Sequence, residues 1–166
     1  MILMGLGANL PSAEFGPPRA TLEAAFDALD ALGIVILARS AYYESAPVPP
    51  SGQPWFVNAA AAVRSSLGPE ALLSTMLGLE GRFGRVRETP GAARVLDLDL
   101  LAYGDVLTPD DAHPALPHPR LHERAFVLHP LLEIAPDWRH PRLGKTAGEM
   151  LAGLKGNQEV RRLQPC

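Results

Sequence analysis

Two aspartates in the stretch AARVLDLDLLAYG, residues 92–104, are the side chains whose type and spacing point most directly to chemistry. Side chains alternate between the faces of a β-strand, so Asp97 and Asp99 would share one face and the leucines beside them the other. With α-carbons about 6–7 Å apart, two carboxylates repel each other unless a cation lies between them. Hard oxygen ligands favour Mg²⁺, which usually shares its coordination shell with phosphates. Taken alone, a D-x-D motif fits two aspartates that face water better than it fits a metal site.

The loop before the aspartates, GRVRETPGAAR, changes that balance because it carries Arg85, Arg87 and Arg94. A planar guanidinium group binds phosphate and carboxylate oxygens in a bidentate fork. We place Arg94 at the junction between loop and strand, where its side chain is free to swing. The alternative is a solvated cluster of surface charges, but three arginines ahead of two carboxylates favour a site for a metal–polyphosphate complex.

A second pair of side chains, Phe56 and Asn58 in WFVNAAAAVR, would share one face of another strand. A flat aromatic ring beside a carboxamide suits a planar heterocycle, which stacks on the ring while the amide reads its edge. The alternative is a core phenylalanine with an asparagine that satisfies the backbone at a sheet edge. Taken alone, the pair fits that alternative better.

Two further motifs give weaker indications of function. GLGAN, residues 5–9, lacks the third glycine of a dinucleotide fingerprint and the G-K-[ST] of a Walker loop, so it predicts a plain strand-to-loop turn. His118 and His122 have the i,i+4 spacing of a metal pair. No third ligand of the usual kind accompanies them, so zinc is not predicted.

The elements that must position these residues follow from hydrophobic periodicity and turn residues. Strands are predicted at 1–7, 34–43, 55–64 and 95–103, and helices at 19–33 and 70–84. This β-α-β-β-α-β order is typical of a ferredoxin-like α/β core with a mainly antiparallel sheet. After it we expect a turn at 104–105, a short strand at 106–107 and helices at 124–134 and 148–154. No linker divides the chain, so residues 1–166 are predicted to form a single domain.

Composition limits the classes of function. With 166 residues, 47% of them hydrophobic and 20% charged, the chain is expected to be globular rather than disordered. A net charge of −3 argues against a nucleic-acid binder with a broadly basic surface. Neither a signal peptide nor an apolar run of about 18 residues is present. Cys166 is the single cysteine, which fits a reducing compartment. We therefore expect a cytoplasmic monomer that binds neither nucleic acid nor membranes.

Taken together, these motifs resemble those of the 6-hydroxymethyl-7,8-dihydropterin pyrophosphokinase family, which acts in folate biosynthesis. AARVLDLDLL is similar to the family signature: a small pair, Arg, two residues, Asp, an aliphatic residue, Asp and two aliphatic residues. Other stretches agree in order, namely GLGANL, YYESAPV, QPWFVNAA, LEGRFGRVR and LPHPRLHERAFVLHPLLEIAP. The resemblance covers essentially Met1 to Pro136.

The resemblance implies a ferredoxin-like α/β fold with extra helices and an enzyme that depends on ATP and two Mg²⁺ ions. It implies transfer of a pyrophosphoryl group from ATP to the hydroxymethyl oxygen of the pterin, with release of AMP. By motif, Asp97 and Asp99 resemble the metal ligands, and Arg85 and Arg94 the arginines that stabilise the transferring phosphates. Further ATP contacts would be Arg87, His118 and Arg124. The pterin contacts would be Ser45, Val48, Phe56, Asn58 and Phe126, with the two phenylalanines sandwiching the pterin ring.

The chain departs from the family pattern in places. Thr89-Pro90-Gly91 stands where many members carry a basic residue and a tryptophan that form a lid. His113 replaces a common arginine, and Pro119 replaces a tyrosine that can follow the histidine. Two rival functions remain: another D-x-D transferase, which leaves the predicted aromatic–amide slot unexplained, and a ferredoxin-like RNA-binding or regulatory module, which the paired aspartates oppose.

Overall fold

The structure is a computed structural model that describes residues 1–84 and 94–165. Within these ranges the chain forms a six-stranded sheet with neighbouring strands in the order β5-β1-β4-β3-β6, and β2 also pairs with β4. All strand pairs are antiparallel. The elements are β1 (Ile2–Ala8), α1 (Pro18–Ala31), β2 (Val35–Arg39), β3 (Tyr43–Ser45), β4 (Phe56–Arg64), α2 (Pro69–Arg82), β5 (Asp97–Tyr103), a 3₁₀ turn (Leu121–Glu123), α3 (Ala125–Ile134), α4 (Ala147–Ala152) and β6 (Val160–Arg162). The predicted ferredoxin-like core is confirmed.

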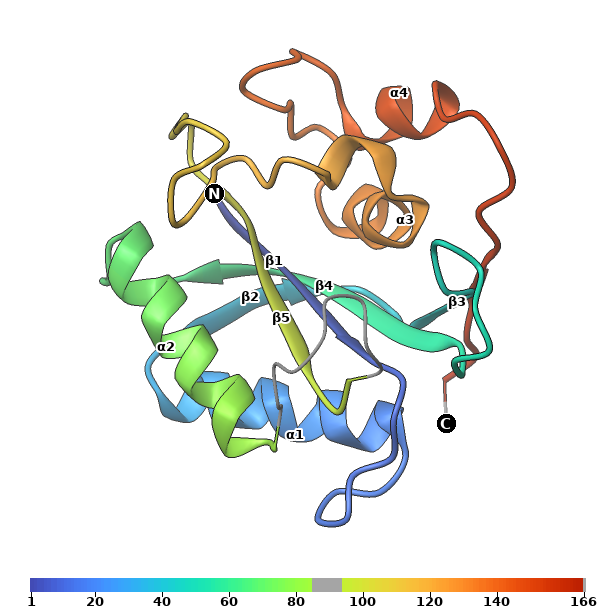
Figure 1. Ribbon diagram of the computed structural model, residues 1–166. Coiled ribbons are helices and arrows are strands. Elements are labelled where there is room, and N and C mark those ends of the chain that lie inside the picture. Colours follow the sequence, from blue (N-terminus) through green and yellow to red (C-terminus); the bar gives the residue numbers. More distant parts are fainter. Residues whose placement is uncertain (85–93, 166) are drawn as a thin grey trace.

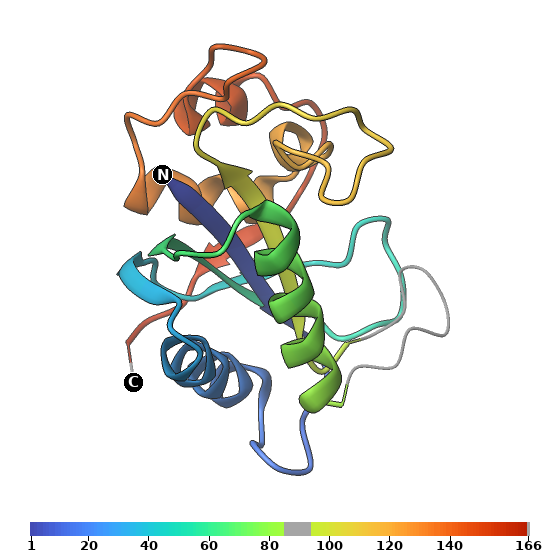
Figure 2. The ribbon, with the colours of Figure 1, turned by 90° about the vertical axis from the view of Figure 1, so that its left-hand side faces the viewer.

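Helices cover both faces of the sheet, with α1 and α2 on one side and α3 and α4 on the other (Figure 1). A view turned by 90° shows the same three layers (Figure 2). The layers follow from alternation along β1, where Met4 and Leu6 join the core beneath α1 and α2 while Leu3 joins the core beneath α3. Each strand of the centre therefore contributes to two separate apolar cores.

The first helix forms as its sequence predicts. Proline at the start of α1 has the backbone angle that a helix needs and lacks only an amide that would be unpaired there. Leu22, Phe26 and Leu29 recur at helical spacing and are buried against the sheet. Gly33 follows the helix with φ of 82°, a left-handed conformation that glycine adopts without strain.

The single strand predicted at 34–43 is wrong, because the chain forms two strands, β2 and β3, that both pair with β4. The register shifts between Ile36 and Ala38. Beyond it, the Ser40 hydroxyl accepts a hydrogen bond from the amide of Ala60 at 2.9 Å, and the amide of Ala41 donates to Glu133 at 3.0 Å. The Ser40 amide still donates to the Ala60 carbonyl at 2.9 Å, but the next amide, that of Ala41, is bound by a side chain and not by β4, and the strand is interrupted there.

Two other short elements differ from the prediction. A turn forms at Gly104 with φ of 56°, but residues 106–107 form no strand. Thr108 instead bonds to Leu116 through both its amide and its hydroxyl, which draws the segment away from the sheet. Conversely, β6 was not predicted, and it pairs with β3 at the sheet edge. Its three residues offer too little alternation for a strand signal.

Glu133 joins α3 to this edge of the sheet and provides a test of the fold. It accepts hydrogen bonds from the Tyr43 hydroxyl at 2.6 Å and the Ala41 amide at 3.0 Å, and pairs with Arg162. Burial opposes ionisation of Glu133, but the hydrogen bonds and the arginine outweigh burial and lower its pKa. Its stabilisation is therefore present above the ordinary glutamate pKa and is lost as pH falls through the lowered value.

We expect Glu133→Gln to lower the free energy of unfolding by about 1–2 kcal/mol at pH 7, because a charged acceptor is lost. The difference from the unmodified protein should shrink as pH falls below the ordinary glutamate pKa of about 4, and it is lost as pH falls through the lowered pKa of the folded protein. Urea unfolding at pH 7 and pH 3 measures both values. Equal differences at the two pH values would show that the charge of Glu133 contributes nothing.

Candidate functional site

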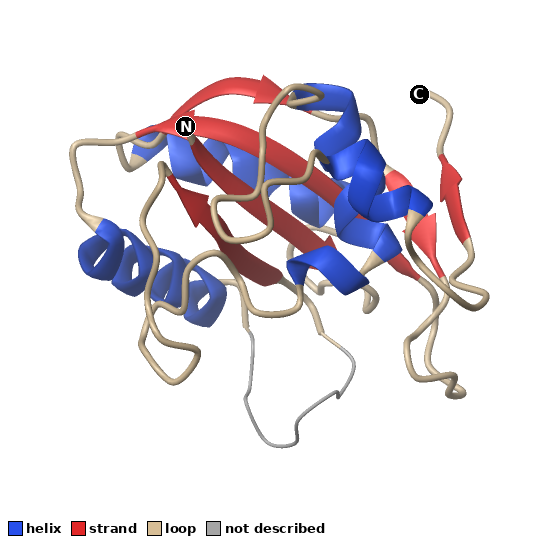
Figure 3. Cartoon of the chain, turned by 90° about the horizontal axis from the view of Figure 1, so that it is seen from above, coloured by secondary structure: helices blue, strands red, loops and turns tan. Residues whose placement is uncertain are grey.

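A pocket of about 820 Å³ opens on the α3 side of the sheet. Viewed from that side, α3 lies above the strands that form the pocket floor (Figure 3). The predicted site residues that line it are Ser45, Val48, Phe56, Asn58, Arg94, Asp97, Asp99, Arg124 and Phe126. Residues that lie more than 80 positions apart in the chain thus meet at one place. Arg85, Arg87 and the Thr89-Pro90-Gly91 stretch lie outside the described residues.

The aspartates project from β5 into this pocket, while Leu96, Leu98 and Leu100 enter the core on the opposite face, as alternation predicts. Across the sheet, Asp97 pairs with Gly7 and Asp99 with Gly5. The neighbours of both carboxylates on β1 therefore have no side chain, which leaves open space above the sheet.

The GLGAN stretch runs from strand into loop, as predicted, with β1 ending at Ala8. Gly5 and Gly7 lie inside β1 and form the pocket floor. A Cβ atom added to Gly7 would lie 3.2 Å from Asn58 Oδ1, closer than ordinary contact. The glycines thus keep the floor low between β5 and β4.

One row of residues crosses the sheet and links the two predicted half-sites. Gly7 pairs with Asp97 on one side and with Asn58 on the other. Two interstrand spacings separate the aspartate from the asparagine, which is roughly 10 Å between α-carbons. The carboxylate pair and the aromatic–amide pair therefore face the same cavity across a single glycine strand.

Arginine side chains offset the charge of the two aspartates only in part. Arg94 Nη1 donates to Asp97 Oδ2 at 2.9 Å, a partly buried ion pair. Burial, and then the negative charge of Asp97, raises the pKa of Asp99 to about 7, although Arg124 and Arg94 act in the opposite direction. The described arginines therefore compensate the pair only in part, and the pocket retains a site that favours a cation.

Arg94 lies at the junction ahead of β5, as predicted, but its side chain is not free to swing. The ion pair holds the guanidinium group. Its carbonyl oxygen accepts hydrogen bonds from the amides of Asn9 and Leu10 at 3.0 and 3.1 Å. Contacts therefore hold both the side chain and the backbone of Arg94.

Arg124 and His118 supply polar groups beside the aspartates. Arg124 caps α3, and its guanidinium group lies 5.5 Å from the centre of the Phe126 ring. His118 is not among the residues that line the pocket, but its amide donates to the Leu101 carbonyl at the end of β5. Burial, and then the charge of Arg124, lowers the pKa of His118 to about 4, so the ring is neutral at pH 7. Its Nδ1 accepts from the Arg120 amide, which places the hydrogen on Nε2.

Asn58 is held by the neighbouring strand β3. Asn58 is buried, and its Nδ2 donates to Ser45 Oγ at 2.8 Å and to the Tyr43 carbonyl at 3.4 Å. The asparagine therefore satisfies its neighbours in the sheet and lines the pocket at the same time. Phe56 borders the pocket on β4 and Phe126 on α3, so each of these two elements brings an aromatic residue to the pocket.

Sequence reasoning missed Glu80, which lies in α2 and is 1% exposed. Its Oε2 accepts from the Leu98 amide at 2.7 Å, on the free edge of β5 between the two aspartates. A readable signal existed, because Glu80 follows Met76 by four positions and so falls on the apolar stripe of its helix. Arg120 and Glu123, which form an exposed ion pair at the pocket wall, were also missed.

The donor set of the pocket fits a hard divalent cation bound together with a ligand. Among the described residues, no group of three or more His, Cys, Asp or Glu side chains could hold a metal ion. Asp97 and Asp99 offer carboxylate oxygens alone, and Mg²⁺ commonly takes one or two such ligands and completes its shell with phosphates and water. The aspartates thus suit a metal that arrives with a phosphate compound.

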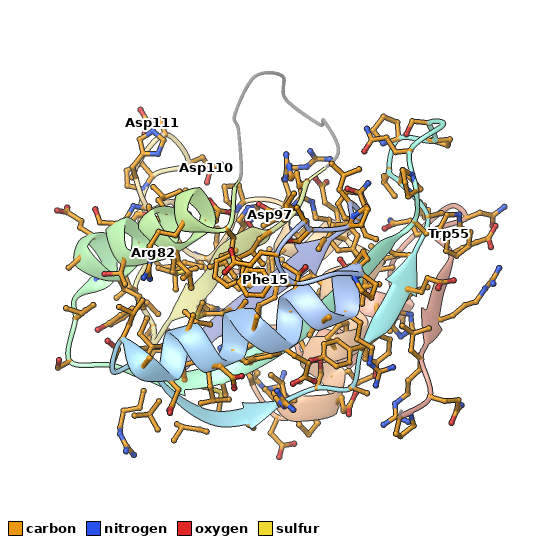
Figure 4. All side chains as sticks on the ribbon, turned by 90° about the horizontal axis from the view of Figure 1, so that it is seen from below. Phe15, Trp55, Arg82, Asp97, Asp110 and Asp111 are labelled. Atoms are coloured by element: carbon orange, nitrogen blue, oxygen red, sulfur yellow. The ribbon has the colours of Figure 1, made fainter. Side chains whose placement is uncertain are left out.

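The aromatic residue at the outer edge of the sheet lies apart from the aspartates. Trp55 lies at the β6 edge, well away from Asp97 (Figure 4). There the Arg161 guanidinium group lies 4.6 Å from the Trp55 ring centre.

None of the helices in residues 1–84 and 94–165 has the length and apolar content needed to cross a lipid bilayer.

Comparison with known proteins gives a consistent set of relatives. A family model described as 7,8-dihydro-6-hydroxymethylpterin-pyrophosphokinase matches residues 3–136. The 2-amino-4-hydroxy-6-hydroxymethyldihydropteridine pyrophosphokinase of Methylorubrum extorquens is 43% identical over 152 residues, which are 91% of each chain. The proteins of the same name from Synechocystis and Pseudomonas aeruginosa are 41% and 40% identical, over 90% and 91% of this chain and 73% and 90% of theirs.

Proposed function

The chain belongs to the 7,8-dihydro-6-hydroxymethylpterin-pyrophosphokinase family, and from this premise we propose how its pocket carries out the family's reaction. The protein is a pyrophosphokinase of folate synthesis, which transfers a pyrophosphoryl group to the hydroxymethyl oxygen of 6-hydroxymethyl-7,8-dihydropterin. The donor in our proposal is ATP. The hydroxymethyl oxygen loses its proton to solvent and bonds to the β-phosphorus. The bond from that phosphorus to the oxygen that bridges it to the α-phosphorus breaks, and AMP leaves with that oxygen.

The observation that carries this proposal is the row Asp97–Gly7–Asn58 across the sheet. It sets a carboxylate pair for a metal–phosphate group beside a slot for a flat heterocycle. A donor on β5 and an acceptor on β4 would face each other over the glycine floor. Phosphoryl-type transfer needs little covalent help from the protein, so positioning and neutralisation of charge do most of the work.

In the donor half, the residues that would hold the nucleotide are Arg94, Arg124 and His118, together with Arg85 and Arg87 from the family resemblance. Asp97 and Asp99 would hold two Mg²⁺ ions, which when bound supply positive charge against the triphosphate. Arg94 would exchange its contact with Asp97 for a phosphate oxygen. His118, neutral at pH 7, would donate from Nε2 without adding a charge.

In the acceptor half, Phe56 and Phe126 would sandwich the pterin, and Asn58 would read its edge. Ser45 and Val48 lie on the same wall and would contribute mainly backbone atoms. Burial between two rings excludes water from the hydroxymethyl group, which protects the transfer from hydrolysis. The rival readings do not account for this slot beside the aspartates.

The test is a coupled assay for AMP formation from ATP, Mg²⁺ and 6-hydroxymethyl-7,8-dihydropterin. We expect AMP to form when all three are present and to depend on the pterin. AMP formation without pterin would point to another D-x-D transferase. Binding of RNA without AMP formation would support the non-enzymatic module.

We also propose that the protein acts as a cytoplasmic monomer. A single cysteine, Cys166, fits a reducing compartment. Sedimentation of the purified protein with and without ligands measures the oligomeric state.

Asn58→Ala is expected to weaken pterin binding by about 5- to 150-fold, because a lost edge hydrogen bond leaves polar groups of the ligand unpaired. Affinity for Mg·ATP should stay nearly unchanged, because Asn58 lies on β4 and the aspartates on β5. Calorimetry with a pterin analogue and with an ATP analogue measures both affinities, and thermal melting checks the fold. If nucleotide binding weakens as much as pterin binding, Asn58 supports the sheet rather than the acceptor.

A further inference from the structure

Asn9 follows β1 directly and is 1% exposed, although it is a polar residue in a loop. Its side chain uses both ends of the amide. Asn9 Oδ1 accepts a hydrogen bond from the Arg94 amide at 2.7 Å. Asn9 Nδ2 donates to Gln53 Oε1 at 3.1 Å and to the Pro54 carbonyl oxygen at 3.1 Å.

The orientation of this amide is fixed by its partners. The Arg94 amide can only donate, so the oxygen of Asn9 must face it, and the Pro54 carbonyl can only accept, so the nitrogen must face that side. The backbone adds to the link, because the Asn9 amide itself donates to the Arg94 carbonyl at 3.0 Å. Asn9 is thus a directional bridge between two segments more than 40 residues apart.

Each end of the bridge holds a different half of the pocket. Arg94 precedes β5 and pairs with Asp97. Gln53 lines the pocket in the loop before β4, and two residues beyond Pro54 the chain reaches Phe56. A shift of Asn9 would therefore move the phosphate-side arginine and the entry to the acceptor strand relative to each other.

We propose that Asn9 is a positioning residue that fixes the distance between the donor and acceptor halves of the pocket. The inference rests on the proposed function, since it assigns the two halves to the two substrates. Asn9 is not among the residues that line the pocket, so it acts through Arg94 and through the 53–54 segment. In-line transfer is sensitive to such placement, because a misplacement of about 1 Å can cost about 10²-fold in rate.

The two ends of the amide can be separated by substitution. Asn9→Asp keeps the oxygen that faces the Arg94 amide, but it sets a second oxygen against the Pro54 carbonyl. Asn9→Ala removes both ends. Ser12→Ala is the matched control, because Ser12 Oγ accepts two backbone hydrogen bonds in the same loop, from Glu14 and Phe15, away from the pocket lining.

We expect Asn9→Asp to weaken binding of a pterin analogue about tenfold, a loss typical of one or two hydrogen bonds, while affinity for an ATP analogue with Mg²⁺ stays nearly unchanged. Asn9→Ala should lower kcat by about 10²-fold with a smaller change in either affinity. Ser12→Ala should match the unmodified protein in all three measurements. Loss of activity only in proportion to the loss of folded protein, or equal weakening of both ligands by Asn9→Asp, would overturn the proposal.

Hydrogen exchange of the protein without ligands separates this inference from the proposed function. In Asn9→Asp, the Arg94 amide should remain protected while the amides at 53 and 55–57 exchange faster than in the unmodified protein. Unchanged exchange at 53 and 55–57 would overturn the bridge whatever the reaction is. If the exchange pattern is as expected but the unmodified protein forms no AMP in response to pterin, the proposed function is contradicted. Asn9 would then only connect the two segments, and its role in positioning the reaction would be overturned.

Discussion

Replacing Asp97 or Asp99 by alanine is expected to lower turnover by about 10³-fold or more while the protein stays folded. Either change removes a carboxylate that would hold the metal–triphosphate complex, and charge stabilisation of this kind is worth several kcal/mol in the transition state. The fold should survive because both side chains project over the glycines of β1 and away from the leucine core. Steady-state AMP formation and thermal melting measure the two effects.

At pH 8 the Asp99→Asn variant is expected to be more stable than the unmodified protein. The raised pKa of Asp99 means that the folded, metal-free protein binds a proton more tightly than the unfolded chain. The stabilisation from that proton is lost as pH rises through about 7, so an ionised Asp99 lowers stability above it. Asp99→Asn, which cannot ionise, should therefore melt at a higher temperature than the unmodified protein at pH 8 in the presence of a chelator.

Leu98→Ala is the matched control, because Leu98 lies between the aspartates and faces the other side. Truncation of a buried leucine costs about 2–5 kcal/mol of stability. We expect a lower melting temperature but normal turnover per folded molecule. The opposite pattern, with collapse of the aspartate variants and loss of catalysis in Leu98→Ala, would show that the aspartates serve the fold.

Local patterns predicted most of the core elements, because each depends on residues near in sequence. Period-two alternation placed Asp97 and Asp99 on the face opposite the leucines, and proline and Gly33 marked the ends of α1. The break between β2 and β3 was not predicted, since it depends on Glu133, some 90 residues away. Propensity cannot report a hydrogen bond between segments that far apart.

Most of the predicted site residues meet in one pocket, but the backbone beneath them was not predicted. Family motifs brought Phe56, Asn58 and the aspartates together, whereas the role of Gly5 and Gly7 depends on the register between β1, β4 and β5. A shift of one residue would have placed leucine on the floor instead. Register is a property of the assembled sheet, so the sequence alone did not show that these glycines form the pocket floor.

A contact made by the C-terminal segment was also not predictable from the sequence. It lies beyond the family match at residue 136, yet Gln158 contacts the start of α3. Gln158 Oε1 accepts from the Ala125 amide at 2.9 Å, and its Nε2 donates to the Glu123 carbonyl at 2.9 Å. One side chain thus holds the backbone on both sides of Arg124, a residue of the predicted donor half. No local pattern in a polar tail indicates such a contact.

Arg94→Ala is expected to lower kcat by about 10²–10³-fold, the usual loss for one donor that stabilises charge in a transition state. Affinity for Mg·ATP should change much less. The guanidinium group contacts Asp97 at 2.9 Å, so a phosphate oxygen that binds Arg94 would replace one ionic contact by another. An interaction that gains strength only as charge develops toward the leaving AMP lowers the barrier rather than the ground state.

Arg94→Lys should recover little of this loss, because an ammonium group cannot form the planar fork that binds two oxygens. Arg39→Ala is the matched control, since it removes an arginine–glutamate pair with Glu23 that lies outside the pocket lining. Steady-state kinetics give kcat, and titration with an ATP analogue gives the ground-state affinity. A fall in ATP affinity that accounts for the whole loss, with the saturated rate unchanged, would show that Arg94 binds the nucleotide without assisting the transfer.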